Sequence, residues 1–250
     1  MIGETKRNTY GTEMKIVADC GNGRVDVQFC DSHAAVVNTA YVNFKRGTVK
    51  NPYDRTVFQT GYLGEGPYLT KVNGKCPISN LVWMAMIQRC YSEKWKDQHA
   101  AYYGICTVSD EWLNYQHFAT WYEENQYEVN GRLHLDKDIL VPGNKVYSAE
   151  TCLLVPQRIN MLFMSKKRKK DADLPTGLHR VFTKDAVKFR SCYNTVELGT
   201  FNTIEEAYDS YVRAKERHIR EVADEYKNII PQKVYDALVG YQCPQLTIKS

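Results

Sequence analysis

The chain has 250 residues, of which 43% are apolar and 25% are charged, so it can bury hydrophobic cores and suits two or three compact units. This composition excludes a disordered chain. The net charge of +4 is modest, so the local grouping of basic residues is more informative than their total.

The cysteines and the N-terminal residues indicate an intracellular protein. None of the eight cysteines forms a Cys-x-x-Cys pair, which favours reduced, packed thiols. The missing pair spacing also disfavours zinc, although a site made of Cys90, Cys106 and Cys152 stays open. No signal-peptide core and no stretch of roughly 20 apolar residues is found. We therefore expect a cytoplasmic protein without a membrane partner.

Residues 1–70 are predicted to form a small β domain. Short apolar alternations such as Val25 to Phe29 are broken by turn residues such as Gly21-Asn22-Gly23, which is typical of antiparallel strands. The glycines between Gly61 and Gly66 lack the lysine and the serine or threonine of a phosphate-binding loop. We expect a connector there.

Residues 71–165 are predicted to form a second domain with two helices. Helical spacing favours a helix over 80–91 with Ser79 as its cap, and a second helix over 115–125. Phe118, Trp121 and Tyr122 make an aromatic face on the second helix, which is typical of a core. Residues 133–140 then favour a strand or hairpin.

Residues 166–176 are predicted to be a linker that begins with five consecutive basic residues. Such a run is compatible with a solvated linker, with an arm that contacts phosphates, or with a nuclear address. The run consists of Lys166, Lys167, Arg168, Lys169 and Lys170.

Residues 177–250 are predicted to hold three strands followed by helices. The strands are expected over 177–182, 187–192 and 196–201, and Thr203 can cap the long helix that follows. Its apolar residues Ala207, Tyr211 and Ala214 are spaced to lie on the sheet. Pro231 is expected to end this helix or to begin a shorter one over 232–239.

The corner between this sheet and its helix, Leu198 to Tyr211, resembles the DNA-binding domain of plant ethylene-response factors, an Apetala-type domain. The resemblance implies a sheet that lies in the major groove with a helix behind it. On one sheet face we expect Arg180 and Arg190 to bind guanine edges, and Lys184 and Lys188 to bind phosphates. A merely solvated basic sheet face is the alternative.

Residues 133–160 resemble the ββα-metal core of HNH endonucleases, and Trp112, Phe118 and Trp121 resemble the aromatic spacing before that core in phage homing enzymes. The resemblance implies a Mg²⁺ or Mn²⁺ site whose ligands would be Asp136, Asp138 and Asn160. Lys137 or Asp138 stands where the family has its general-base histidine. His134, two residues before Asp136 and on the same strand face, is a displaced alternative to that base.

We therefore expect an α+β protein with three parts: a small N-terminal β unit, a divergent HNH-like centre, and a C-terminal three-stranded antiparallel sheet packed on a helix. The expected function is site-specific binding of double-stranded DNA, as in phage HNH homing-endonuclease-like proteins in a bacterial host, with metal-dependent cleavage if the centre is active. The alternative is an inactive nuclease that regulates or blocks a site by occupying it. A protein-interaction module, such as an inhibitor of a host defence system, is a third interpretation.

Overall fold

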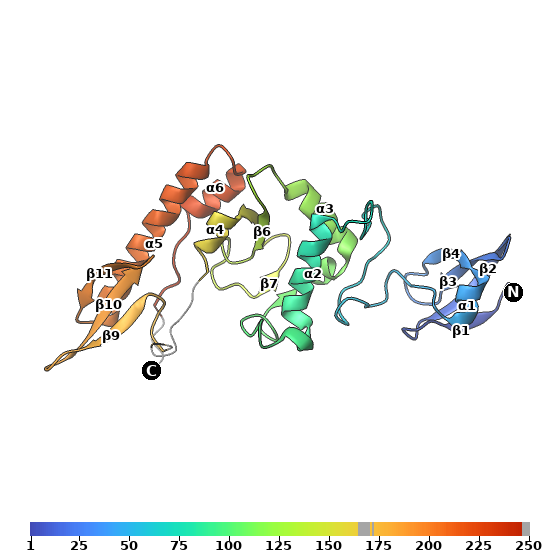
Figure 1. Ribbon diagram of the computed structural model, residues 1–250, viewed down its shortest axis with the longest axis horizontal. Helices are drawn as coiled ribbons and strands as arrows, with labels where there is room; N and C mark the ends of the chain where they lie inside the picture. Colours follow the sequence, from blue (N-terminus) through green and yellow to red (C-terminus); the bar gives the residue numbers. More distant parts are fainter. Residues whose placement is uncertain (165–170, 172, 247–250) are drawn as a thin grey trace. The chain divides into compact units, whose positions relative to one another are not determined.

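The computed structural model describes residues 1–164, 171 and 173–246 of the chain (Figure 1). These residues form a mixed α and β protein with several small sheets and six α-helices, which confirms the expected class. The chain divides into two compact units, Met1–Glu123 and Glu124–Ser250. The boundaries expected at residues 70, 165 and 176 stay predictions.

The first unit begins with the predicted antiparallel β unit. Its sheet has the order β1 (Thr5–Arg7), β2 (Glu13–Gly21), β3 (Arg24–Phe29) and β4 (Val36–Ala40). Alternate residues of β2 and β3 are buried, and they pack with Phe44 of α1 (Tyr41–Arg46). Asn22 and Gly23 both have positive φ, which is the geometry of a tight hairpin turn. The sheet is therefore amphipathic, with one face covered by its own helix.

Two helices follow in the first unit, α2 (Ile78–Tyr91) and α3 (Tyr115–Asn125), close to their predicted ranges. Short elements lie between them: η1 (Glu93–Trp95), β5 (Thr107–Val108) and η2 (Asp110–Leu113). Phe118 and Tyr122 are buried as predicted, and Trp121 is half-buried against Trp112. The indole of Trp83 donates a 2.8 Å hydrogen bond to the carbonyl of Trp112, which ties α2 to the entry of α3.

The predicted cap of α2 is wrong. The helix begins at Ile78 after Pro77, so Ser79 already lies inside its first turn. The Ser79 hydroxyl is buried and lies 3.3 Å from the hydroxyl of Tyr115 on α3. A serine near a helix start can cap its own helix or bond to a neighbouring one, and here the contact between helices prevails.

The glycine-containing segment Gly61–Gly66 is a packed connector, as expected. Gln116 of α3 donates from Nε2 to the carbonyls of Leu63 and Tyr68, and its Oε1 accepts from the backbone of Tyr68. Gly64 has a φ of +69° and leaves no room for a Cβ beside Asn114. Both the positive φ and the close approach of the Asn114 side chain, directly before α3, favour glycine at this position.

The second unit begins with a β-β-α arrangement. β6 (Leu133–Asp136) pairs antiparallel with β8 (Leu153–Pro156), and α4 (Gln157–Met161) follows β8 directly. The loop between the strands contains β7 (Val146–Tyr147). This order agrees with the resemblance noted for residues 133–160, and the resemblance itself stays a prediction.

The rest of the second unit is the predicted sheet with its helices. β9 (Leu178–Phe182), β10 (Val187–Tyr193) and β11 (Val196–Phe201) form an antiparallel sheet with β10 in the middle. α5 (Ile204–Tyr226) starts at Thr203, whose side chain accepts a hydrogen bond from the backbone of Glu206, as predicted. Pro231 precedes the final helix, α6 (Gln232–Val239).

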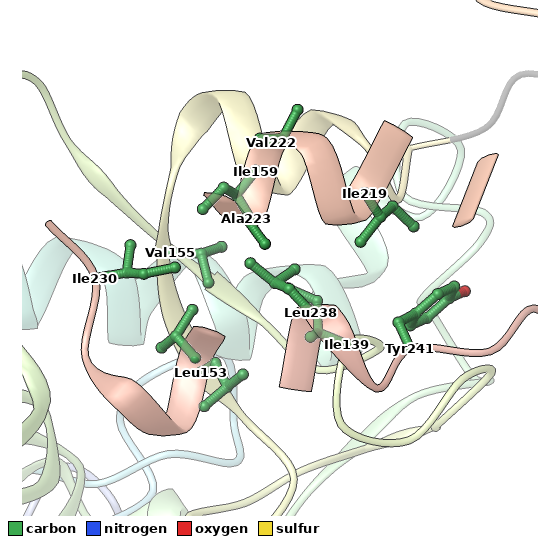
Figure 2. Close-up of a cluster of buried hydrophobic side chains, with 11 residues drawn as sticks. Ile139, Leu153, Val155, Ile159, Ile219, Val222, Ala223, Ile230, Leu238 and Tyr241 are labelled. Atoms are coloured by element: carbon green, nitrogen blue, oxygen red, sulfur yellow. The ribbon is translucent and has the colours of Figure 1, made fainter. Parts of the chain in front are cut away.

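One face of α5 contributes to two separate hydrophobic clusters of the second unit. Toward its start, Ala207 and Tyr211 pack on Leu174 and Leu178 beneath the sheet. Toward its end, a second cluster joins α5 to β8, α4 and α6 (Figure 2). Its buried members are Ile139, Leu153, Val155, Ile159, Ile219, Val222, Ala223, Ile230, Val234, Leu238 and Tyr241.

Part of the predicted linker is packed into the second unit. Leu174 is buried in the cluster beneath the sheet, and Asp171 is also buried. Asp171 and Leu174 thus belong to the fold around the sheet, whereas Asp173 is exposed and the basic run 166–170 lies outside the described residues.

Truncation of Ile219 tests the second cluster. Ile219 is fully buried, so we expect Ile219→Ala to lower the free energy of unfolding by about 2–5 kcal/mol through lost burial and the cavity left behind. Ile229 is 49% exposed and provides a matched control. Chemical denaturation should show a much smaller loss for Ile229→Ala; equal losses would contradict the packing of α5.

Candidate nucleic-acid interface

The side of the C-terminal sheet that faces away from α5 carries two basic residues. Across the strands, Arg190 lies opposite His179 and Thr200, and Lys188 lies opposite Val181. Residues directly opposite each other project from the same side of a sheet, as do residues two apart on one strand. These side chains therefore share a surface that we call the outer face, made of His179, Val181, Lys188, Arg190 and Thr200.

The expectation that Arg180 shares this face is wrong. Arg180 lies opposite Phe189, which packs against the cluster beneath the sheet together with Phe201. Its guanidinium binds the carboxylate of Asp173, with 2.9 Å between Nη1 and Oδ1. Arg180 therefore projects from the helix side of the sheet and is neutralised by a neighbouring acid.

The remaining basic residues of the prediction lie in different places. Lys184 is in the turn between β9 and β10, which Thr183 closes by a backbone bond to Ala186. The basic run lies outside the described residues, namely Lys166, Lys167, Arg168, Lys169 and Lys170. Of the predicted contacts, the structure thus brings only Lys188 and Arg190 together on one face, with Lys184 at the hairpin turn.

Arg190 is held loosely within the protein. Its Nε lies 3.6 Å from the Glu197 carboxylate, too far for a hydrogen bond, and both side chains are about half exposed. The Nε makes no hydrogen bond within the described residues, although it is shielded from solvent. An exposed ion pair is worth only about 0–1 kcal/mol, so the guanidinium can exchange Glu197 for another partner at little cost.

His179 is a member of the outer face that the sequence did not single out. Its Nδ1 lies 2.9 Å from a carboxylate oxygen of the buried Asp171. The same carboxylate also accepts from the backbone of Arg180. No local pattern marks this pair, because its carboxylate lies eight residues away in a segment that was predicted to be a linker.

In the central segment, Asp136 stabilises a turn. Its carboxylate is buried and accepts 2.8 Å hydrogen bonds from the backbone amides of Asp138 and Ile139. Burial is the main cause that raises the pKa of Asp136 above its usual range. His134 lies two residues earlier on the same strand and is half-buried opposite Val155 of the hydrophobic cluster.

Lys137 is a buried cation with three oxygen partners. Its Nζ donates to both carboxylate oxygens of Asp138, at 2.9 and 2.8 Å, and to the carbonyl of Asn144, at 2.7 Å. The side chain of Asn144 donates back to the carbonyl of Lys137. The ammonium group thus braces the loop between β6 and β8. The sequence indicated Lys137 but gave no sign of Asn144 as its partner.

The two aspartates predicted to bind magnesium or manganese have protein partners in this structure. Both oxygens of Asp138 already bind an ammonium group, and one oxygen of Asp136 binds two amides. Asn160, the third predicted ligand, is half-buried on α4. Among the described residues, no three His, Cys, Asp or Glu side chains are grouped to hold a metal. A metal would have to displace the Lys137 ammonium.

The alternative zinc ligands are buried thiols. Cys90 and Cys106 are buried in the first unit and Cys152 in the second. Burial raises the pKa of Cys152 to about 12, so without a metal this thiol stays protonated at neutral pH. Cys152 is therefore suited to packing.

Comparison with known proteins gives no relative: no family model, no curated protein and no solved structure matches the chain. The two family resemblances noted in the sequence stay predictions. Within residues 1–164, 171 and 173–246, none of the helices combines the length and apolarity needed to span a bilayer.

Replacement of Lys137 tests its structural role. Lys137→Met keeps the approximate length of the side chain but removes its charge. The Asp138 carboxylate and the Asn144 carbonyl then lose the hydrogen bonds that the Lys137 ammonium donates. We expect a loss of about 1–3 kcal/mol in the free energy of unfolding. Lys145→Met, at an exposed position of the same loop, should change little in the same denaturation measurement. An unchanged stability in Lys137→Met would contradict the brace.

Proposed function

We propose that this chain binds double-stranded DNA through the outer face of the β9–β10–β11 sheet and acts by occupying its site. The observation that carries the proposal is the placement of Lys188 and Arg190 two residues apart on the sheet side that α5 leaves free. On the opposite side, Phe189 and Phe201 pack against the cluster that contains Ala207 and Tyr211 of α5, which supports the sheet beneath these cations.

The major groove of DNA admits two antiparallel strands, so β10 and one of its neighbours in this three-stranded sheet would enter it. In this arrangement Arg190 would present its planar guanidinium to the O6 and N7 acceptors of a guanine. Lys188 and the turn residue Lys184 would contact phosphates and fix the position of the sheet without selecting a sequence. The basic run 166–170 would add further phosphate contacts.

The contacts of Arg190 also suit reversible binding. Free protein keeps the guanidinium next to Glu197, and DNA would replace this carboxylate by a stronger set of acceptors. Because the internal ion pair is exposed, little stability is lost in the exchange. Glu197 also weakens the attraction of Arg190 to arbitrary phosphates. The affinity for DNA would therefore depend more on the contact between Arg190 and the correct base.

Occupancy rather than cleavage is favoured by the central segment. The Lys137 ammonium binds the Asp138 carboxylate, which a metal would need as a ligand. The Asp136 carboxylate accepts a hydrogen bond from the backbone. Metal-dependent phosphodiester hydrolysis stays a second candidate because β6, β8 and α4 follow the order of a ββα core. This candidate requires that Lys137 leave Asp138.

Two arginines on opposite sides of one sheet give a matched test of the binding face. We expect Arg190→Ala to weaken binding to a preferred duplex, selected from a random pool, by about 1–3 kcal/mol and to weaken scrambled duplex less. Arg180→Ala should leave both affinities near wild type. Fluorescence anisotropy at one fixed salt concentration measures both. Equal loss for the two duplexes, or a larger effect of Arg180→Ala, would reject the outer face as the reader.

Cleavage is tested with the same selected duplex. Incubation with Mg²⁺ or Mn²⁺, and with a chelator as control, should retain the DNA without cutting it. Cuts that need metal and disappear in Asp136→Asn and Asp138→Asn would instead establish the second candidate. The purified protein should be free of contaminating nuclease. The variants also control for this, because cutting by a contaminant would persist in them.

A further inference from the structure

A cleft of about 700 Å³ opens within the second unit, between the β6–β8–α4 segment and one end of the C-terminal sheet. Arg132 before β6 and Arg158 of α4 line one side, and the start of β9 and the end of β10 line the other. Its volume lies in the range of roughly 300–1,000 Å³ that is typical of small-molecule sites. Lys184, Lys188 and Arg190, the described cations proposed to contact DNA, do not line this cleft, although His179 of the outer face does.

The charge of the cleft favours an anion. Its described lining includes Arg132, Arg158, His179 and His218, and it includes no aspartate or glutamate. Arg158 is paired with Glu225 at 2.7 Å, whereas Arg132 is an exposed side chain at the rim. Guanidinium groups bind phosphate oxygens by two parallel hydrogen bonds, so a phosphate is the anion that this lining suits best.

The two histidines are held in fixed orientations. Asp171 binds Nδ1 of His179, which leaves Nε2 as the nitrogen available to a ligand. His218 Nδ1 lies 2.9 Å from the hydroxyl of Tyr193 and 3.2 Å from the side-chain amide of Asn194. As an acceptor from that amide, Nδ1 carries no proton, so neutral His218 has its N–H at Nε2. Neutral His218 can therefore donate to an anion from Nε2. His179 donates its Nδ1–H to Asp171, so its Nε2 donates to an anion only when the imidazole carries a second proton.

The same cleft has an aromatic and apolar wall. Tyr193 and Tyr211 line it and meet edge to face, with ring centroids 5.7 Å apart. Met161 and Leu162 of the α4 region add apolar surface. Burial raises the pKa of Tyr193 to about 12, so its hydroxyl stays neutral. A planar heterocycle could stack or pack against this wall. A ligand that is only a phosphate would use the basic residues and would not need the wall.

We propose that this cleft binds a nucleotide, with Arg132 and His179 at its phosphate and the tyrosine wall at its base. The nucleotide is either free in solution or a residue of DNA whose base has left the stack. The proposal does not rest on DNA recognition by the outer face. His179 is the one member of that face that also lines the cleft, and the cleft can be tested with mononucleotides alone.

Calorimetric titration of the full chain tests the cleft at constant ionic strength. The titrants are the four deoxynucleoside monophosphates, deoxyadenosine and inorganic phosphate. We expect at least one monophosphate to bind about tenfold more tightly than deoxyadenosine or phosphate. Arg132→Ala and His179→Ala should each weaken it about tenfold, the loss expected for one charge-assisted contact. Arg220→Ala, at an exposed position of α5 outside the cleft, should bind like wild type.

The outcomes separate the proposals. No binding, phosphate binding as tight as nucleotide binding, or equal weakening by Arg220→Ala would overturn the nucleotide cleft. Arg190→Ala should keep full mononucleotide affinity even where it abolishes DNA recognition. A duplex that contains 2-aminopurine distinguishes the two sources: increased fluorescence upon binding, lost in Arg132→Ala, identifies a base taken from DNA, and unchanged fluorescence with tight mononucleotide binding identifies a free nucleotide.

Discussion

The architecture of the second unit depends on the burial of one face of α5 along most of its length. Ala207 and Tyr211 anchor the C-terminal sheet, and Ile219, Val222 and Ala223 anchor β8, α4 and α6. An α-helix is stiff and rises about 1.5 Å per residue, so two clusters on one helix keep a defined separation. The outer face and the nucleotide cleft both follow from this constraint, since the first is the sheet surface that α5 does not cover and the second lies between the two anchored parts.

The sequence predicts this part of the fold well because its signals are local. Alternating strands, two short turns, the Thr203 cap and apolar residues at helical spacing each act within a few residues. The relative facing of Arg180 and Arg190 is not local. It depends on the strand register, in which each even-numbered residue of β10 lies opposite an odd-numbered residue of β9. The two even-numbered arginines must therefore project from opposite sides, and a turn one residue longer would have placed them together.

The central segment shows why site chemistry is harder to predict than strands. Asp136, Lys137 and Asp138 are the residue types that a hydrolytic site uses, but they also make turn and loop contacts. The backbone amides two and three residues after Asp136 donate to its carboxylate, and the Asn144 carbonyl accepts from Lys137, which lies seven positions earlier in the chain. Residue type and spacing alone do not distinguish the two uses. The local hydrogen bonds do, because each oxygen that accepts from the protein is less available to a metal.

Placement of charge also bears on the proposed binding of nucleic acid by a chain whose net charge is only +4. Acidic partners neutralise several of its cations: Asp138 binds Lys137, Asp173 binds Arg180, and Glu225 binds Arg158. Such cations add to the number of positive charges but attract a distant anion only weakly. The reason is that each ion pair is nearly neutral beyond the screening length of about 8–10 Å. Arg190 differs because its acidic neighbour is not hydrogen-bonded to it, and Arg132 because it lies on the rim of a cleft whose described lining has no acid. The affinity for the proposed nucleic-acid ligand should therefore depend on the few cations whose partners can be exchanged, and not on the total net charge.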